Sequence, residues 1–221
     1  MLKADKLLIT QLASAEDTER QHAALALQAL PRGHFEDHPP SRKFILGLQA
    51  ALLLAYQTSA SELVRDWCVQ LLADAQVMGA EMEGLVKAAL QPECAFLKTL
   101  LYYISLNPRR FQDCKSQILR LSAHPDEEVR WRCAYVLEML VLDYDSDAAT
   151  LRGLFADSCE TTRTYAVLAF KRLRRLEVED ISALQALIQT NADAASAHAQ
   201  DLLAGRIDPY CSADPLAHQR G

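Results

Sequence analysis

The residues with the most evident chemical potential lie in one short segment, PRGHFEDHPP (residues 31–40). His34 and His38 bracket Glu36 and Asp37 there, and nitrogen and carboxylate ligands of these types bind divalent metals. Histidines four residues apart share one face of a helix, but the two prolines that follow disfavour a helix at this point. The ligands are then not held in a fixed geometry, and we interpret the segment as a solvated polar loop that holds no metal.

Cysteine chemistry is the second possibility, and the spacing argues against it. The six cysteines are Cys68, Cys94, Cys114, Cys133, Cys159 and Cys211. No two of them form the CxxC pair of a zinc ribbon or a redox motif. Cys68 and Cys133 fall on the apolar faces of helical patterns, where a thiol acts as a small hydrophobic side chain. We therefore expect six free thiols.

Motifs for nucleotide binding are absent, because the chain contains neither GxGxxG nor GxxxxGK[ST]. No local pattern singles out a nucleophile, although catalytic triads are assembled in space and not in sequence. We expect a protein that is not an enzyme and binds no cofactor. The alternative is an enzyme, or a cofactor- or nucleobase-binding protein, that acts in a groove of the fold.

The composition indicates helices and an acidic surface. Among 221 residues, 23 Lys and Arg against 29 Asp and Glu leave a net charge of −6, and half of the residues are hydrophobic. Only 7 glycines and 8 prolines provide too few turns for a many-stranded sandwich or barrel, whereas the abundant Ala and Leu favour helices.

The charge distribution argues against a nucleic-acid partner, because phosphate binding needs a basic groove. The basic residues cluster at one place only, at Lys171, Arg172, Arg174 and Arg175. We interpret this cluster as a solvated helix end, which the helix dipole favours. A local docking patch for an acidic partner is the alternative.

No stretch reaches the roughly 20 uncharged apolar residues of a membrane span. The N-terminal residues include Asp5, Glu16 and Asp17 and lack the long apolar run of a signal peptide. We therefore expect a cytoplasmic protein without a membrane partner.

A helical repeat is visible from residue 123 to 140, AHPDEEVRWRCAYVLEML. Asp126 suits an N-cap, and Val129 and Cys133 begin an apolar series with the spacing of one helical face. Shifted by 33 residues, ADSCETTRTYAVLAFKRL repeats the arrangement. Five copies carry a basic residue at the same place, at Arg20, Arg65, Lys98, Arg130 and Arg163.

An amphipathic segment precedes each copy, so that the units are helix pairs. The first helices are expected at residues 2–12, 42–56, 81–90, 111–121 and 148–155, and a sixth pair at 181–189 and 193–204. Two-helix units at such spacing are typical of an α-solenoid, in which stacked neighbours bury each other's apolar faces. We expect an all-α solenoid of about five to six antiparallel helix pairs. It would form a single domain over residues 1–206, followed by a mostly unpacked tail, 207–221.

The pattern Asp126-x-x-Val129-Arg130 with its apolar continuation resembles HEAT repeats. The resemblance implies a right-handed solenoid in which the second-helix Arg and a turn Asp link adjacent repeats into a ladder. The ladder residues would be Arg20, Arg65, Arg130 and Arg163, with Lys98 as a substitute. Only Arg130 has the Asp at the matching place; the other arginines have Glu16, Ser61 and Cys159 there.

Large side chains recur two residues after the ladder position, where a solvated face would carry charge. That position holds His22, Trp67, Leu100, Arg132 and Tyr165. Trp131 and Tyr135 lie beside this row, and HEAT-like solenoids line their concave surface with second helices. Because Trp, Tyr and Arg are enriched in binding hot spots, we predict a protein-binding surface at Trp67, Trp131, Arg132, Tyr135 and Tyr165. The alternative is that some of these aromatic rings pack between repeats.

Together these features favour a non-enzymatic solenoid that binds another protein through its concave face. An adaptor, a scaffold or a toxin-neutralising immunity protein fits the small size and the acidic charge, and the charge favours a basic partner. The oligomeric state has no signature in the sequence.

Overall fold

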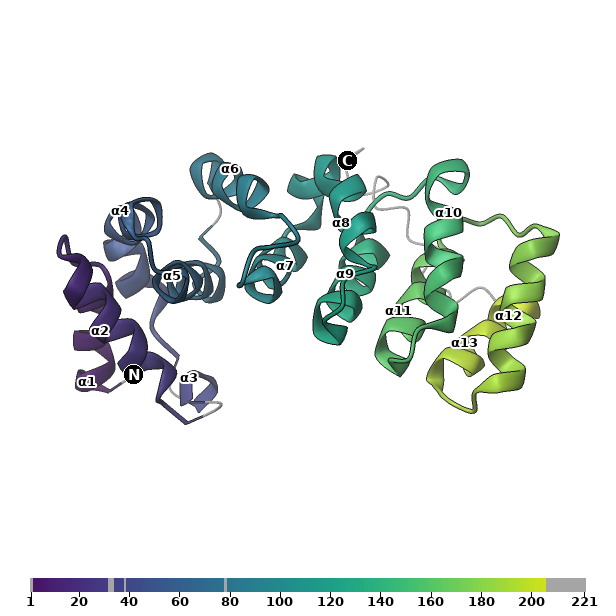
Figure 1. Ribbon diagram of the computed structural model, residues 1–221, viewed down its shortest axis with the longest axis horizontal. Coiled ribbons are helices and arrows are strands. Elements are labelled where there is room, and N and C mark those ends of the chain that lie inside the picture. Colours follow the sequence, from purple (N-terminus) through teal and green to yellow (C-terminus); the bar gives the residue numbers. More distant parts are fainter. Residues whose placement is uncertain (1, 32–33, 38, 78, 206–221) are drawn as a thin grey trace, which may run out of the picture. The chain divides into compact units, whose positions relative to one another are not determined.

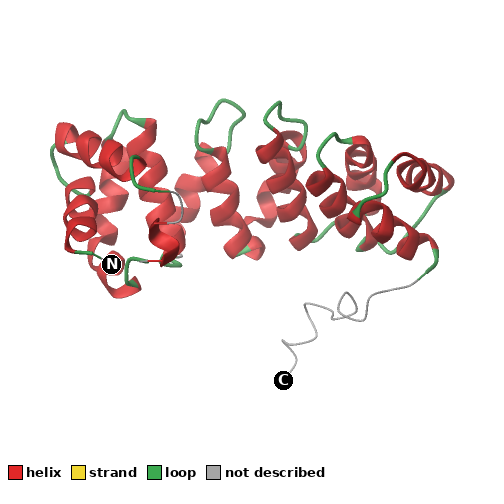
Figure 2. Cartoon of the chain, turned by 90° about the horizontal axis from the view of Figure 1, so that it is seen from below, coloured by secondary structure: helices red, strands yellow, loops and turns green. Residues whose placement is uncertain are grey.

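The computed structural model describes residues 2–31, 34–37, 39–77 and 79–205. These residues fold into α-helices and two short 3-10 helices, and they contain no strand (Figure 2). The expected all-α solenoid is confirmed. The tail 207–221 and the side chain of His38 lie outside the described residues.

The chain divides into two compact units, residues 1–111 and residues 112–221. The predicted single domain over residues 1–206 stays a prediction, because a stack of repeats that forms one domain can also be divided in this way.

Unit 1 contains three helix pairs and one additional helical turn (Figure 1). The pairs are α1 (Lys3–Leu12) with α2 (Asp17–Gln28), α4 (Arg42–Thr58) with α5 (Glu62–Asp74), and α6 (Ala80–Ala89) with α7 (Leu97–Leu106). The additional turn is α3 (His34–Asp37). The second helices α2, α5 and α7 pack against one another in succession.

Unit 2 contains three more pairs, preceded by the 3-10 helix η1 (Pro108–Cys114) at the boundary between the units. The pairs are α8 (Lys115–Leu121) with α9 (Glu127–Met139), α10 (Tyr144–Gly153) with α11 (Glu160–Lys171), and α12 (Val178–Thr190) with α13 (Ala194–Leu203). The 3-10 helix η2 (Leu154–Ala156) continues α10. The second helices α9, α11 and α13 again pack in succession.

Helices are present in all six predicted pairs, but their starts differ from the predictions. The helix predicted over residues 111–121 begins as the 3-10 helix η1 and is α-helical only from Lys115, and two other first helices begin earlier than their apolar pattern does. Helix α10 begins at Tyr144, because the Asp143 side chain accepts the backbone N–H of Ser146 as an N-cap. Helix α12 begins at Val178, where Asp180 accepts the N–H of Glu177. Polar capping extends both helices beyond the residues that contact the core.

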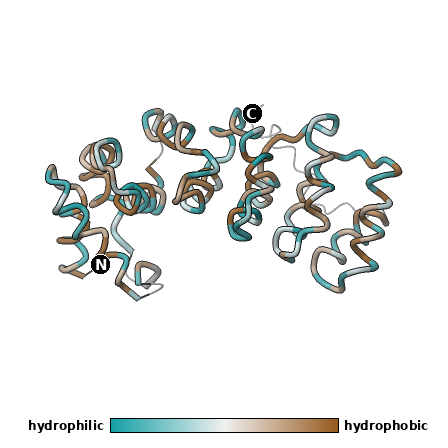
Figure 3. Tube along the Cα trace, in the orientation of Figure 1, coloured by the Kyte–Doolittle hydropathy of each residue, from teal (hydrophilic) through white to brown (hydrophobic). Residues whose placement is uncertain are grey.

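The cores are formed by the apolar stripes that the repeats predict, and hydrophobic and hydrophilic residues alternate along the helices (Figure 3). Val129 is only 2 % exposed and Cys68 and Cys133 are fully buried, as predicted. Burial raises the pKa of the Cys68 thiol to about 12. The five described cysteines are free thiols, and Cys211 lies outside the described residues.

The segment 31–40 is not entirely the loop that its prolines indicate. Residues 34–37 form the helical turn α3, and His34 Nε2 lies 3.1 Å from Asp5 Oδ1 of α1. The Phe35 ring meets the Trp67 ring of α5 edge to face, with centroids 6.0 Å apart. Contacts with two neighbouring helices thus stabilise a turn that its local sequence disfavours.

Candidate functional site

The ladder position is occupied in unit 2 by arginines that link consecutive repeats. Arg130 of α9 donates from Nε to Asp157 Oδ2 at 2.6 Å and from Nη2 to Asp157 Oδ1 at 3.2 Å. Asp157 lies in the loop before α11 and is itself nearly buried. The Asp157 carboxylate holds the pKa of Arg130 above its ordinary value.

Arg163 of α11 repeats this arrangement one repeat later. Its Nη2 donates to Asp193 Oδ2, the N-cap of α13, and its Nη1 donates to the carbonyl oxygens of Asp157 and Ser158 at 2.6 and 2.9 Å. Arg130 contacts the carbonyls at the same offsets, five and six residues before it. The acidic partners therefore lie in the following repeat, and Asp126 serves mainly as the N-cap of α9.

In unit 1 the basic residue at the ladder position contacts other groups. Arg20 donates to the carbonyls of Ser14 and Ala15, at the same offsets, and to Asp17 Oδ1 at 2.8 Å. Asp17 Oδ1 also accepts from the Ser59 hydroxyl of the next repeat at 2.9 Å, so the link runs through a neutral group.

The remaining two ladder positions of unit 1 differ again. The Arg65 guanidinium lies 5.8 Å from the centroid of the Phe96 ring of the next repeat, and 4.0 Å from Glu62 of its own helix. Lys98 lies half-buried in the first turn of α7.

The first helices carry a second series of ion pairs, which the sequence pattern did not predict. Three buried aspartates in the first turns of first helices each accept the backbone N–H of the N-cap residue and pair with a basic side chain. These are Asp5 with Leu2 and His34, Asp147 with Asp143 and Lys115, and Asp180 with Glu177 and Arg152. Lys115 and Arg152 come from the preceding repeat. The sequence signal was an acidic residue in the first turn of a helix. Such a residue is typical of ordinary helix capping, and its ion pair with the preceding repeat depends on how the repeats pack.

The predicted aromatic residues of unit 2 lie together on the second helices α9 and α11. The Tyr135 and Tyr165 rings meet across the two helices with centroids 4.9 Å apart. The Arg132 guanidinium lies 4.7 Å from the Trp131 ring centroid, and its Nη2 is 2.8 Å from Glu128 Oε1. The four predicted residues are half-buried. The rings thus contact each other between repeats and still keep exposed surface.

We name this arrangement the α9–α11 surface and define it as Trp131, Arg132, Tyr135 and Tyr165. Met139 and Leu168 are half-buried apolar residues on the same two helices. Leu168 follows Arg163 at the offset at which Tyr135 follows Arg130, so the repeat spacing alone could have added it.

The row two residues after the ladder is not uniform in unit 1. Leu100 is fully buried, because α7 turns this position toward the core. Trp67 is half-buried and contacts Phe35 of α3, as described above. Its predicted role in binding stays a prediction.

The basic cluster after α11 consists partly of structural residues. Arg172 pairs with Glu138 of α9 at 3.7 Å, and Arg175 pairs with Asp145 and stacks 4.3 Å from the Tyr144 ring centroid. Arg174 adopts a positive φ of 52° where the helix ends. At least two of the four cations are thus engaged within the unit.

Within the described residues, no helix is both long enough and apolar enough to cross a membrane. The same residues contain no group of three or more His, Cys, Asp and Glu side chains placed to hold a metal ion.

Comparison with known proteins shows a likeness in fold. No family model and no curated protein matches the chain. The chain is similar to a solved structure of computationally designed armadillo repeat proteins for modular peptide recognition, with a TM-score of 0.64 and 18% identity. The match covers 90% of this chain and 98% of that chain. The likeness shows a helical-repeat solenoid, and the resemblance to HEAT repeats in particular stays a prediction.

Proposed function

We propose that this chain is a non-enzymatic solenoid that binds a segment of a partner protein on its α9–α11 surface. The observation that carries the proposal is the Tyr135–Tyr165 pair, in which two half-buried rings from consecutive repeats contact each other and keep some exposed surface. Aromatic side chains provide much contact area while losing little conformational freedom.

The neighbouring residues support a pre-organised binding surface. Arg132 is held between the Glu128 carboxylate and the Trp131 ring, so that little side-chain freedom is left to lose when a ligand binds. Trp, Tyr and Arg are also the residue types that dominate binding energy at interfaces.

The ladder fixes the spacing of the helices that carry this surface. The Arg130–Asp157 and Arg163–Asp193 pairs join α9, α11 and α13 at their N-terminal ends. A rigid array of this kind suits an extended segment, whose side chains would meet successive repeats. The recognition of peptides by the designed repeat proteins supports the same class of ligand.

Within this class, the net charge of −6 favours a basic partner, since opposite charge speeds encounter. An adaptor, a scaffold or a toxin-neutralising immunity protein in the cytoplasm fits such a partner.

The test is selection of random linear peptides displayed on phage, followed by fluorescence anisotropy with the tightest binders. Tyr135→Ser and Tyr165→Ser should each weaken binding by about 1 kcal/mol or more, with the melting temperature within a few degrees of the parent. Val178→Ser, which removes an exposed apolar side chain of α12, is the matched control and should leave affinity unchanged.

Two outcomes would contradict the proposal. One is that selection on the protein yields no peptide that binds. The other is that both tyrosine variants lose stability while their peptide affinity stays at the parent value, which would make the rings purely structural.

A further inference from the structure

An unpaired apolar face lies on α4 in unit 1, on a first helix and apart from the surface of the proposed function. Leu46, Gly47, Ala50 and Leu54 are all exposed and recur at the spacing of one helical face. Leu46 is 43 % and Leu54 55 % exposed. The other side of the helix already provides the core residues, such as Leu52, so that these leucines are not needed for folding.

The face is hollowed at its N-terminal end. A shallow depression of about 420 Å³ is lined by Ser41, Lys43, Phe44, Gly47 and Leu48. Apart from its chain neighbours and the backbone of its own helix turn, no atom lies within 4 Å of where a Cβ on Gly47 would stand. Glycine in a helix interior lowers stability, and here it leaves room for the side chain of another molecule.

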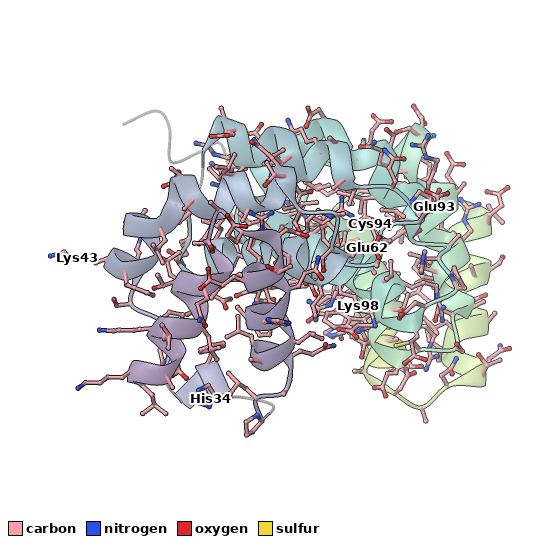
Figure 4. The ribbon with its side chains drawn as sticks, turned by 60° about the vertical axis from the view of Figure 1, so that its left-hand side comes forward. His34, Lys43, Glu62, Glu93, Cys94 and Lys98 are labelled. Atoms are coloured by element: carbon pink, nitrogen blue, oxygen red, sulfur yellow. The ribbon has the colours of Figure 1, made fainter. Side chains whose placement is uncertain are left out.

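Two lysines, Lys6 and Lys43, border this end of the face, and Lys3 lies one helical turn before Lys6 on α1. Lys3 and Lys6 of α1 and Lys43 of α4 are exposed, and the Lys6 ammonium lies 6.0 Å from the Phe44 ring centroid. None of the three has a carboxylate partner among the described residues. Figure 4 shows the Lys43 side chain pointing away from the helices. Unpaired cations beside an apolar stripe, on a chain with net negative charge, form a local complement to an acidic amphipathic ligand.

We propose that this α1–α4 face, defined as Lys3, Lys6, Lys43, Leu46, Gly47, Ala50 and Leu54, docks an acidic amphipathic helix of a partner protein. The stripe is one helix wide and apolar at three- and four-residue intervals, which matches the ridges of a second helix. A large apolar side chain of that helix enters the depression over Gly47, and its acidic end meets the lysines.

A lipid surface fits the same face less well. Gly47 and Ala50 contribute little apolar area to insert among acyl chains, whereas small residues let a partner helix approach closely. Stable membrane anchoring also needs a larger apolar or basic contribution than two leucines and three lysines provide.

The test uses three labelled probes on the full chain: a helix-forming peptide with a leucine stripe and Glu at one end, the same peptide with Lys in place of Glu, and a scrambled acidic peptide without the stripe. The first should bind about tenfold or more tightly than the other two, with an affinity that falls as salt rises. The double variant Lys6→Glu/Lys43→Glu should lose this preference for acid. Arg120→Glu, at an exposed site of α8, matches the change in net charge of either single substitution, Lys6→Glu or Lys43→Glu, and should keep the preference.

Gly47→Leu separates docking from folding. The change fills the depression and replaces a helical glycine, so the melting temperature should rise while binding of the acidic striped peptide weakens by about tenfold or more. Loss of binding in a more stable protein cannot come from misfolding.

The proposal is overturned if none of the three peptides binds, if the Lys and Glu peptides bind equally, or if Gly47→Leu binds like the parent. It is also overturned if the only ligand is a vesicle of phosphatidylcholine with phosphatidylserine, with no binding to pure phosphatidylcholine, because the face would then recognise anionic lipid. Any of these outcomes would refute docking on the α1–α4 face without contradicting the proposed function, because the α9–α11 surface belongs to the other unit and is tested with other peptides and variants.

Discussion

The two units use the same helical-repeat scaffold but connect its repeats with different chemistry. In unit 2 the links are ion pairs, Arg130 with Asp157 and Arg163 with Asp193. In unit 1 the corresponding links pass through the Ser59 hydroxyl and the Phe96 ring. Each of these links starts from an arginine of a second helix, whereas the group that it reaches in the next repeat is a carboxylate, a hydroxyl by way of Asp17, or an aromatic ring.

The first helices repeat the contrast. Asp147 and Asp180 of unit 2 pair with a cation from the preceding repeat. In unit 1 Asp5 pairs with His34, which comes from α3, an element without a counterpart among the helices described for unit 2. Charge should therefore matter more to the stability of unit 2, while the apolar cores of the two units should be equally sensitive.

The largest effect should come from charge placed in either core. Val64 and Val129 occupy the same position, three residues after the N-caps Ser61 and Asp126, and both are almost fully buried. Val64→Asp and Val129→Asp should each cost about 3–5 kcal/mol, because an unpaired carboxylate is desolvated. Urea unfolding followed by circular dichroism measures both. A variant with the same free energy of unfolding as the parent would show that its helix is rotated relative to this structure.

Next in size is loss of a buried carboxylate on the first helices of unit 2. Burial alone would raise the pKa of Asp180, but hydrogen bonds from Tyr144, Glu177 N–H and Arg152 lower it below its ordinary value. The stability that this carboxylate contributes is therefore present at neutral pH and is lost as the pH falls through its folded pKa. Asp180→Asn should cost about 3 kcal/mol at pH 7, because the buried pair with Arg152 is broken, and less below pH ~4.

Asp66 of unit 1 should have the opposite effect on stability at neutral pH. Burial raises the pKa of Asp66, and one of its carboxylate oxygens is buried without a hydrogen-bond partner among the described residues. Because the folded state favours the neutral carboxyl, Asp66→Asn should raise the melting temperature at pH 7, and the gain should shrink as the pH falls. Melting curves of both Asn variants across pH measure the contrast, and parallel curves would refute it.

The ladder itself should show a smaller, asymmetric effect. Arg130→Ala leaves the nearly buried Asp157 without its bidentate partner and should cost about 2–3 kcal/mol. Arg65→Ala removes a partly exposed cation–π contact and should cost about 0.5–1 kcal/mol. Equal losses in urea unfolding would mean that the two links contribute alike.

The sequence predicts the part of this architecture that repeats. The apolar stripes and the basic residue in each copy identify six helix pairs, because an amphipathic helix must bury one face against a neighbour. The partner of each ladder residue could not be predicted. Asp157 and Asp193 lie 27 and 30 residues after their arginines, and the lengths of the intervening loops decide which residue of the next repeat faces each arginine.

The candidate site, too, could be predicted from the sequence only in part. The clustering of Trp131, Arg132, Tyr135 and Tyr165 follows from helical periodicity together with the repeat spacing. The contact between Trp67 and Phe35 does not follow from either, because α3 lies in a proline-bounded segment whose structure depends on tertiary contacts. The apolar face of α4 is visible in the sequence as Leu46, Ala50 and Leu54, but which side of a largely apolar helix is buried is decided only when the helices pack.

The smallest expected effect concerns the turn α3. Phe35→Ala should cost about 0.5–1.5 kcal/mol through loss of the edge-to-face contact with Trp67. It should also expose the indole of Trp67 to water, which shifts its fluorescence to longer wavelength. Since the chain has a second tryptophan, Trp131, the measurement is made in a Trp131→Phe background with and without Phe35→Ala. If the emission of Trp67 does not shift, α3 does not shield the ring. The contrast between Trp67, covered by an additional element in unit 1, and the Tyr135–Tyr165 pair, which lies between second helices of unit 2, then no longer holds.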